Sequence, residues 1–304
     1  MFDVAIIGGG PAALSAAIYT ARAGKTTIVF ERSAIGGLVA QTNRIENYPG
    51  FIGAGIGLTD QMKSQAEASG AKLNYGECSK VEASPDGTCS LTIDSNTTQA
   101  KTIIIASGNE PRPLGVPGED KATISRCATC DAALYKGKIV AVIGGGDSAI
   151  QESLHLANLA DKVIVISRSA FRASPTLLTR ATQDYVNIDL RQNTTLNEIA
   201  RMDTNSQILN ITHPDGRGEF LQVQGIFAYI GYNPASRFLQ DSGVTLDPEG
   251  YVVTEPKTHA TNLKGIFAAG DIEAGSTKQA ITAAAAGAEA AIAAVQHLDA
   301  PTQK

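Results

Sequence analysis

The pattern of hydrophobic and polar positions predicts a strand, a turn, a helix and a second strand at the start of the chain. Residues 3–7 are expected to form a strand, apolar from Val4 onward, that leads into a glycine-rich turn. Small and apolar residues at helical spacing then predict a helix over residues 11–23, which Gly24 ends. Residues 26–30 are β-branched or aromatic and predict the next strand. This order is half of a doubly wound sheet.

The same order recurs later in the chain. A strand is expected over residues 139–143, and a second glycine turn, a helix over 148–159 and a strand over 163–166 follow it. Because each copy can belong to its own nucleotide-binding fold, we expect an α/β protein with two Rossmann-like domains of the three-layer ββα type.

Clusters of proline and glycine mark two places where the chain is expected to cross between domains. They lie at residues 111–118 and 231–234, and such clusters interrupt regular structure. Both flank the second copy of the pattern. We therefore expect residues 113–235 to form a domain that is inserted into a discontinuous domain of residues 1–112 and 236–304.

Length and charge narrow the class of protein. A chain of 304 residues is about twice a typical domain. Its net charge of −5 gives no attraction for nucleic acid or an anionic membrane, and we expect neither as a partner. The first apolar run begins at Val4, which leaves no room for a signal peptide, so a cytoplasmic protein is expected. The alanine-rich stretch 280–295 is interrupted by Glu289 and is interpreted as a packed helix rather than a membrane span.

Each glycine turn follows an apolar strand and opens a helix, the context in which such a turn binds a dinucleotide. The glycines let the backbone approach a pyrophosphate, which then lies at the positive end of the helix. Alanine takes the third glycine position in both copies. The first turn contributes Gly8, Gly10, Pro11, Ala12 and Ala13, and the second contributes Gly144, Gly146, Asp147, Ser148 and Ala149.

The two copies differ where the second strand ends. Glu31 stands in the first copy at the position that accepts the hydroxyls of the adenosine ribose. The second copy has Ser167 there, with Arg168 and Arg172 close by. Guanidinium groups suit a 2′-phosphate, which favours NADPH over NADH at the second site. The alternative is that these arginines belong to a solvated turn.

Two of the four cysteines, Cys127 and Cys130, form a C-x-x-C pair. In a reducing compartment such a pair is typically redox-active or metal-binding. Zinc would need a second pair of ligands, and the sequence offers none at a suitable spacing, so no metal site is expected. Cys78 and Cys89 are expected to be buried packing residues.

Taken together, several motifs resemble the low-molecular-weight thioredoxin reductases, which are FAD flavoproteins supplied with electrons by NADPH. The resemblance extends over nearly the whole chain. Besides the first glycine turn, it rests on residues 36–37, 46–50, 115–119, 127–131, 229–234 and 265–271.

The resemblance implies a homodimer that reduces thioredoxin or a similar small protein. It assigns Cys130 to the flavin-facing role, Cys127 to attack on the substrate disulfide, and Asp131 to protonation of the leaving thiolate. A helix-capping role for Asp131 is the alternative. Beyond the first glycine turn and Glu31, the FAD-binding positions implied by the resemblance are Gly36, Gly37, Leu38, Val39, Gln41, Asn47, Ala106, Gly108, Gly270, Asp271, Lys278, Gln279 and Ala280.

The chain departs from the family pattern at the second nucleotide site. Family members usually have His-Arg-Arg where this chain has Ser167-Arg168-Ser169, so one arginine is missing. NADH or ferredoxin therefore stays open as the electron donor. Leu38 and Lys278 also replace the usual Gln and Arg, which affects flavin potential more than flavin binding. Two other functions stay open: an FAD-dependent oxidase of small dithiols, and a redox sensor without catalytic turnover.

Overall fold

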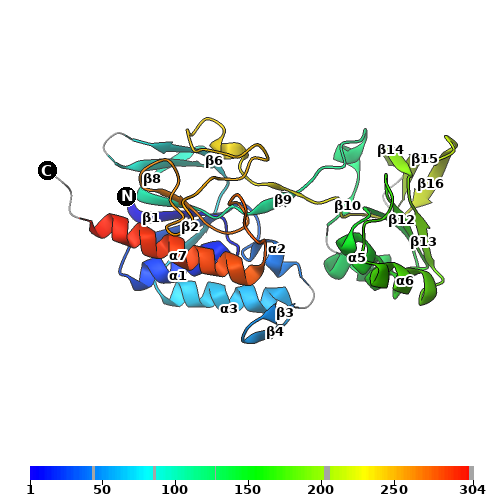
Figure 1. Cartoon of the computed structure of the whole chain (residues 1–304), viewed down its shortest axis with the longest axis horizontal. Helices are drawn as coiled ribbons and strands as arrows, with labels where there is room; N and C mark the ends of the chain where they lie inside the picture. Colours follow the sequence, from blue (N-terminus) through cyan, green and yellow to red (C-terminus); the bar gives the residue numbers. More distant parts are fainter. Residues whose placement is uncertain (43–44, 85–86, 127, 202–205, 301–304) are drawn as a thin grey trace. The chain divides into compact units, whose positions relative to one another are not determined.

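The computed structural model describes residues 1–42, 45–84, 87–126, 128–201 and 206–300 (Figure 1). These residues form two compact units. Unit 1 consists of Met1–Glu110 and Asn233–Lys304, and unit 2 consists of Pro111–Tyr232.

Unit 1 is built on a seven-stranded sheet in which β5, β2, β1 and β8 are parallel neighbours, β19 also pairs with β8, and β7 and β6 continue as antiparallel strands. Its elements are β1 (Phe2–Ile7), α1 (Pro11–Arg22), β2 (Thr27–Glu31), α2 (Gly37–Ala40), β3 (Ile45–Tyr48), β4 (Phe51–Gly53), α3 (Gly55–Ala68), β5 (Lys72–Tyr75), β6 (Cys78–Ala83), β7 (Cys89–Ile93), β8 (Asn96–Ile105), a 3-10 turn (Arg237–Leu239), β19 (Ile266–Ala268) and α7 (Ala280–Asp299).

The apolar run of β1 is continuous because both faces of its sheet are covered. Val4 and Ile6 pack toward one core with the alanines of α1 and α7. Ala5 and Ile7 point to the opposite face and pack with residues of β6, β7 and β8. Helices α1, α3 and α7 lie side by side on their face of the sheet (Figure 1).

Helix α7 is long and apolar enough to cross a membrane by length and composition alone. In the structure its alanine face is buried in the core of unit 1, against α1. Gly287 permits this contact, because a Cβ atom there would stand 2.0 Å from the carbonyl oxygen of Ala12. The interpretation of this stretch as a packed helix agrees with that burial.

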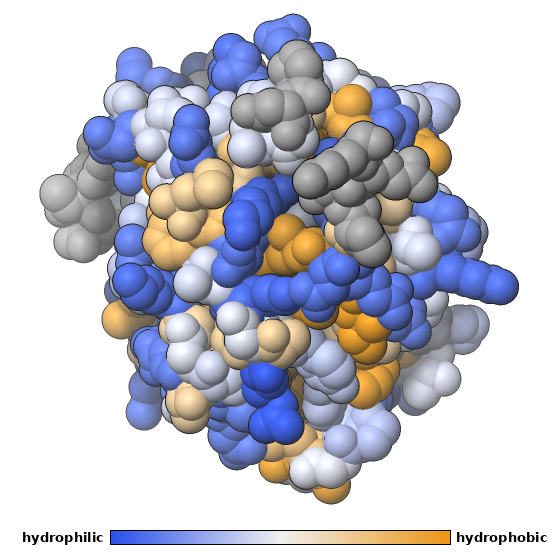
Figure 2. Space-filling model, turned by 90° about the vertical axis from the view of Figure 1, so that its left-hand side faces the viewer, coloured by the Kyte–Doolittle hydropathy of each residue, from blue (hydrophilic) through white to orange (hydrophobic). Residues whose placement is uncertain are grey.

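Figure 2 shows that hydrophobic side chains on one face of the molecule are interspersed with polar ones.

Unit 2 has three layers. Helices α5 and α6 cover one face of a parallel five-stranded sheet of order β10-β17-β11-β12-β13, and an antiparallel sheet of order β14-β15-β16 covers the other. Its elements are a 3-10 turn (Glu119–Lys121), β10 (Ile124–Ser125), α4 (Ala128–Asp131), a 3-10 turn (Ala132–Tyr135), β11 (Ile139–Ile143), α5 (Asp147–Ala157), β12 (Lys162–Ile166), α6 (Pro175–Gln183), β13 (Ile188–Arg191), β14 (Thr195–Arg201), β15 (Gln207–Thr212), β16 (Gly218–Val223) and β17 (Gly225–Ala228).

The chain passes between the units along two short strands, β9 (Asn109–Pro111) and β18 (Tyr232–Pro234), which pair with each other. Arg112 strengthens the pairing: its backbone N–H donates to the carbonyl oxygen of Gly231 at 2.9 Å, and its Nε donates to that of Tyr232 at 2.9 Å. The α/β fold class predicted from the sequence is confirmed. The large sheet of unit 2 is parallel, that of unit 1 is mixed with parallel strands at its centre, and helices cover one face of each.

Candidate functional site

The first glycine turn joins β1 to α1 and approaches other backbone closely. Gly8 has a φ of 108°, and a Cβ atom there would lie 2.2 Å from the carbonyl oxygen of Ala106, at the end of β8. Gly10 faces open space and precedes α1, whose start has no side-chain cap among the residues that the structure describes. The first N–H groups of α1 are therefore available to an anion, such as a pyrophosphate.

Glu31 ends β2 against this turn. Its side chain is buried, and a Cβ atom at Gly9 would stand 3.0 Å from its Oε2. Oε1 accepts hydrogen bonds from the backbone N–H and the hydroxyl of Ser33, at 2.8 and 3.1 Å. The glycine turn and the start of α1 together form what we call the first cradle. The carboxylate is thus held beside this cradle, where a ribose attached to a bound phosphate would lie.

A second segment of unit 1 is tied to the same turn. The Gly36 N–H donates to the carbonyl oxygen of Gly9 at 2.7 Å, and Gly36 adopts a left-handed conformation with φ 112°. Its neighbour Gly37 approaches Gly10, since an added Cβ atom would lie 3.3 Å from the Cα of Gly10. Helix α2, which contains Leu38 and Val39 and ends before Gln41, begins from this point.

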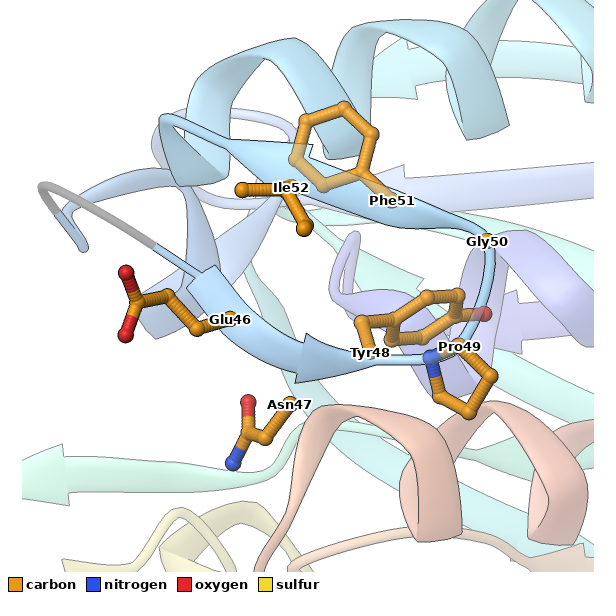
Figure 3. Close-up of a pocket in the computed structure, with 7 residues that line it drawn as sticks. All are labelled: Glu46, Asn47, Tyr48, Pro49, Gly50, Phe51 and Ile52. Atoms are coloured by element: carbon orange, nitrogen blue, oxygen red, sulfur yellow. The ribbon is translucent and has the colours of Figure 1, made fainter.

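The hairpin of β3 and β4 lines a cavity of about 610 Å³ formed by residues 46–52 (Figure 3). Its Asn47 side chain points away from Phe51 and Ile52 in Figure 3. The amide Nδ2 of Asn47 donates to Oε1 of Gln279 at 3.1 Å. Gln279 caps α7 at its N-terminus through a capping box with Thr282, so Ala280 begins the helix beside this contact.

The turn after β19 completes this region. Gly270 has φ 86° and packs on Ala12, whose Cβ would be 2.8 Å from a Cβ at position 270. Burial raises the pKa of the neighbouring Asp271, and the charge of Lys278 opposes that shift. Lys278 donates from Nζ to the hydroxyl of Tyr251 at 2.6 Å, and its ammonium lies 4.1 Å from the ring centroid.

Buried polar atoms in unit 1 support the assignment of a polar ligand to this region. Within the part of the chain that the structure describes, the Ser107 hydroxyl, the Asn109 side-chain oxygen and the Ser276 hydroxyl are buried without a hydrogen-bond partner. Buried polar atoms are ordinarily satisfied, so each calls for an explanation. Ser107 and Asn109 flank Gly108 just after β8, and Ser276 lies between Asp271 and Lys278. The sequence reasoning missed all three, because a single polar residue after a strand forms no pattern.

The second glycine turn joins β11 to α5 in unit 2. Gly144 has φ 151°, and a Cβ atom there would lie 2.3 Å from the carbonyl oxygen of Tyr229 and 3.0 Å from the Cβ of Ala149. Gly146 faces open space just before α5. No side chain among the described residues caps the start of this helix. Asp147 accepts a hydrogen bond from the Ser174 N–H at 2.6 Å, and Ser148 is exposed at the helix start.

Ser167 fills the position next to this turn where an acidic residue would contact a ribose. It is buried, and its Oγ would be 2.3 Å from a Cβ at Gly145. Arg168 and Arg172 are exposed beside it, and the Arg172 N–H donates to the carbonyl oxygen of Gly145 at 2.7 Å. The structure therefore brings both arginines to the edge of the second cradle.

The dithiol segment is only partly described. Cys127 lies outside the described residues, and the structure describes Cys130 only by its backbone, within α4. The buried Ala128 N–H donates to the hydroxyl of Tyr229 at 2.7 Å. Burial, and secondarily the charge of Glu152, raise the pKa of Tyr229 well above its usual value, so the phenol stays protonated.

Asp131 is half-buried at the end of α4. It precedes a 3-10 turn but makes no side-chain cap hydrogen bond in the part of the chain described, which speaks against the capping alternative. It lies close enough to Tyr135 and Tyr229 to contribute to the raised pKa of both, after the larger effect of burial.

Cys78 and Cys89 begin β6 and β7 and are buried in the core of unit 1, as expected for packing residues. Burial raises the pKa of Cys78 to about 11. Its thiol is therefore protonated at neutral pH and unreactive.

A family model described as "Pyridine nucleotide-disulphide oxidoreductase" matches residues 2–287. A thioredoxin reductase of Listeria monocytogenes is 40% identical over 93% of this chain and 89% of the relative. A thioredoxin reductase of Bacillus subtilis is 38% identical over 98% of this chain and 94% of the relative. The crystal structure of Lactococcus lactis thioredoxin reductase is 34% identical, with a TM-score of 0.87 and coverage of 98% of this chain and 99% of that chain.

The chain belongs to the pyridine nucleotide-disulphide oxidoreductase family. It is an oxidoreductase of the flavoprotein type, and FAD and NADPH are the cofactors of the thioredoxin reductases in this family. The resemblance seen in the sequence motifs is confirmed. The turn at Gly8, the carboxylate of Glu31 and the polar atoms after β8 that are unpartnered among the described residues fit FAD, because they supply anion-binding N–H groups, a ribose acceptor and further hydrogen-bonding groups for a polar ligand.

Proposed function

We propose that this protein is a thioredoxin-disulfide reductase in which unit 1 binds FAD and unit 2 binds NADPH and carries the Cys127/Cys130 dithiol. The observation that supports this proposal best is the pair of open glycine cradles, one in each unit. FAD held by unit 1 would supply the two-electron chemistry that connects a nicotinamide donor to a disulfide.

The residues of unit 1 hold the cofactor at several points. The first N–H groups of α1 bind the pyrophosphate, Glu31 accepts the ribose hydroxyls, and Asp271 binds the ribityl region. Asn47 and Gln279, which are joined by a hydrogen bond, lie with Ala280 at the ring end. The remaining positions proposed to contact FAD are Gly36, Gly37, Leu38, Val39, Gln41, Ala106, Gly108, Gly270 and Lys278.

The residues of unit 2 select the nucleotide. The N-terminus of α5 binds its pyrophosphate, and Arg168 and Arg172 bind the 2′-phosphate. The buried Ser167 carries no charge that would repel this phosphate, whereas an acidic residue in its place would. NADPH is therefore the proposed donor.

The dithiol performs the exchange with the substrate. The Cys127 thiolate attacks one sulfur of the substrate disulfide and forms a mixed disulfide, while the other substrate sulfur leaves as a thiolate that Asp131 protonates. The Cys130 thiolate then attacks Cys127, releases the second substrate thiol, and leaves the Cys127–Cys130 disulfide to be reduced again. The hydrogen bond from the Ala128 N–H to the Tyr229 hydroxyl holds the start of α4, the helix that contains Cys130 and Asp131.

Thioredoxin or a thioredoxin-like protein is the proposed partner, on the strength of relatives that are named for reducing it. We also propose a homodimer in the cytoplasm, without nucleic acid or membrane as a partner. The net charge of −5 supports the last point, because it gives an anionic polymer or surface no attraction.

Anaerobic titration tests the cofactor and the donor together. Purified protein should be yellow, and NADPH should bleach its flavin absorbance faster than NADH at equal concentration. Addition of oxidised thioredoxin should restore the absorbance, and a Cys130→Ser variant should bleach but fail to turn over thioredoxin. A flavin that stays oxidised with NADPH but is bleached by reduced ferredoxin would contradict the donor assignment.

A further inference from the structure

A buried histidine in unit 1 contacts two carboxylates. His259 lies in the loop before β19, with 8% of its surface exposed and a left-handed backbone at φ 57°. Its Nδ1 is 2.7 Å from Oε1 of Glu273, and its Nε2 is 2.9 Å from Oε2 of Glu289. Glu273 is buried in the turn after Asp271, whereas Glu289 is largely exposed on α7. The imidazole therefore joins the turn to the helix.

The second oxygen of Glu273 continues this connection toward the first cradle. Oε2 accepts a hydrogen bond from the Gly270 N–H at 2.9 Å, and Oε1 also accepts one from the Thr254 hydroxyl at 2.9 Å. Gly270 packs directly on Ala12, in the first turn of α1. One unbroken series of contacts thus runs from the surface of α7 to the cradle.

A second path leads from Glu289 to the same residue. Gly287 lies two positions earlier on α7, and its backbone approaches Ala12 so closely that a Cβ atom would meet the Ala12 carbonyl oxygen at 2.0 Å. Both glycines therefore rest on Ala12, one from the turn and one from the helix. The His259 contacts join the two segments that carry them.

The charge state of His259 follows from its surroundings. With a carboxylate at each ring nitrogen, both nitrogens act as donors only in the imidazolium form. The hydrogen bond to Glu273, followed by that to Glu289, raises the pKa of His259 to about 9 despite its burial. The raised pKa means that the stabilising effect is fully present below the ordinary pKa of 6.5 and is lost as pH rises through about 9.

We propose that His259 is a positioning residue for FAD: by joining Glu289 to Glu273 it holds α7 and the Gly270 turn against Ala12, and so keeps the first cradle in its binding shape. This inference rests on the proposed assignment of FAD to unit 1. It adds a site that lies outside the cofactor contacts and acts on them through two glycines.

The experiment measures the dissociation constant of FAD from the apoprotein, by flavin fluorescence, between pH 6 and pH 10. His259→Asn is the test variant, because asparagine tolerates a left-handed backbone and so removes the charged contacts without adding strain. His297→Gln is the control, since His297 also lies in unit 1, on α7, but contacts Phe267 through its ring. Glu289→Gln is a second variant, chosen because Glu289 is largely exposed and its side chain is not part of the packed core.

The wild type should bind FAD with constant affinity near neutrality and lose affinity as pH rises through about 9. His259→Asn should bind about tenfold more weakly at pH 7, the effect of 1.4 kcal/mol, and should lack the loss near pH 9. Ionisation of FAD itself changes the affinity of both proteins alike, so the difference between their pH profiles reports on His259. Glu289→Gln should move the loss to lower pH, and His297→Gln should behave like the wild type.

An affinity of His259→Asn within about twofold of the wild type at pH 7, or an unchanged pH profile, would overturn the inference. An equal loss of FAD affinity in His297→Gln would also overturn it. If His259→Asn does not fold, a Glu289→Gln profile of affinity against pH that is not shifted from that of the wild type would do so. A wild-type apoprotein that takes up no FAD would instead overturn the proposed function, which separates the two failures.

Discussion

Replacement of Gly287 by alanine sets two effects of known size against each other. In an isolated helix the change would stabilise α7 by about 1 kcal/mol, because alanine has the higher helix propensity. In the folded unit the new Cβ atom would stand 2.0 Å from the carbonyl oxygen and 2.8 Å from the carbonyl carbon of Ala12. Backbone atoms cannot rotate away as a side chain can, so we place the cost at the upper end of the usual overpacking range, about 3 kcal/mol.

The expected net loss is about 2 kcal/mol of unfolding free energy for unit 1, or roughly 4–8 °C in Tm for a unit of this size. Urea unfolding of the FAD-loaded protein measures it. Ala285→Gly is the matched control: position 285 is exposed on the same helix, so only the propensity cost of about 1 kcal/mol applies. The wild type should be most stable and Gly287→Ala least. A Gly287→Ala protein that unfolds at the same or a higher urea concentration than the wild type would refute the close contact on which the reasoning depends.

Two further substitutions and one labelling experiment test other parts of the molecule. Arg172→Ala should raise KM for NADPH roughly 10- to 100-fold, the effect of one lost charge-assisted hydrogen bond of about 1.5–3 kcal/mol, with KM for NADH nearly unchanged; equal effects on both would contradict the phosphate role. Cys78 should resist iodoacetamide at pH 8 in the folded protein and react after denaturation, because burial raises its pKa to about 11; mass spectrometry of the labelled peptide checks this. Glu152→Gln should stabilise the protein at pH 8 but not at pH 5 in urea unfolding. Burial raises the pKa of Glu152, so the folded state loses stability as pH rises above the ordinary value of 4.5, and glutamine removes this loss; an equal effect at both pH values would be inconsistent with a buried acid.

Local patterns predicted the central elements of the fold well, because their cause is local. The continuous apolar run of β1 is that of a strand covered on both faces, and α1 begins at the proline of the glycine turn. The helix ends differ by one or two residues from expectation: α1 ends at Arg22 and α5 begins at Asp147. Such shifts are ordinary where the last hydrogen bonds of a helix fray.

The strands that form the third layer of unit 2 were not located from the sequence. β15 alternates buried and half-buried residues, and β16 alternates exposed residues with half-buried or buried ones. The sheet over which β14–β16 lie is nevertheless assembled from residues distant in the chain. An amphipathic strand shows that one face is covered and does not show by what. Which sheet covers that face depends on residues far away in the chain. The sequence could therefore predict a three-layer type of domain, but not which strands form its third layer.

The candidate site likewise has features that local sequence predicts and features that only the fold brings together. The cradles could be predicted, because glycines, a preceding strand and a following helix are contiguous. The hydrogen bond between Asn47 and Gln279 joins residues separated by 232 positions, and no pattern in either segment points to the other. His259 was likewise passed over, because its two carboxylates come from a turn and a helix that only the fold brings to it.

Small residues explain why cofactor binding and packing are linked in unit 1. A dinucleotide cradle requires the start of α1 to stay open on one side, so the neighbouring elements must hold that helix from the other side. Ala12 is held there by Gly270 and Gly287, both of which lie too close to it for a side chain. Because close-packed contacts of this kind yield little to strain, a displacement of either segment moves the cradle itself. The alanine-rich composition of α7 suits this requirement, because small side chains permit close approach along α1, and Gly287 approaches Ala12 in the first turn of that helix.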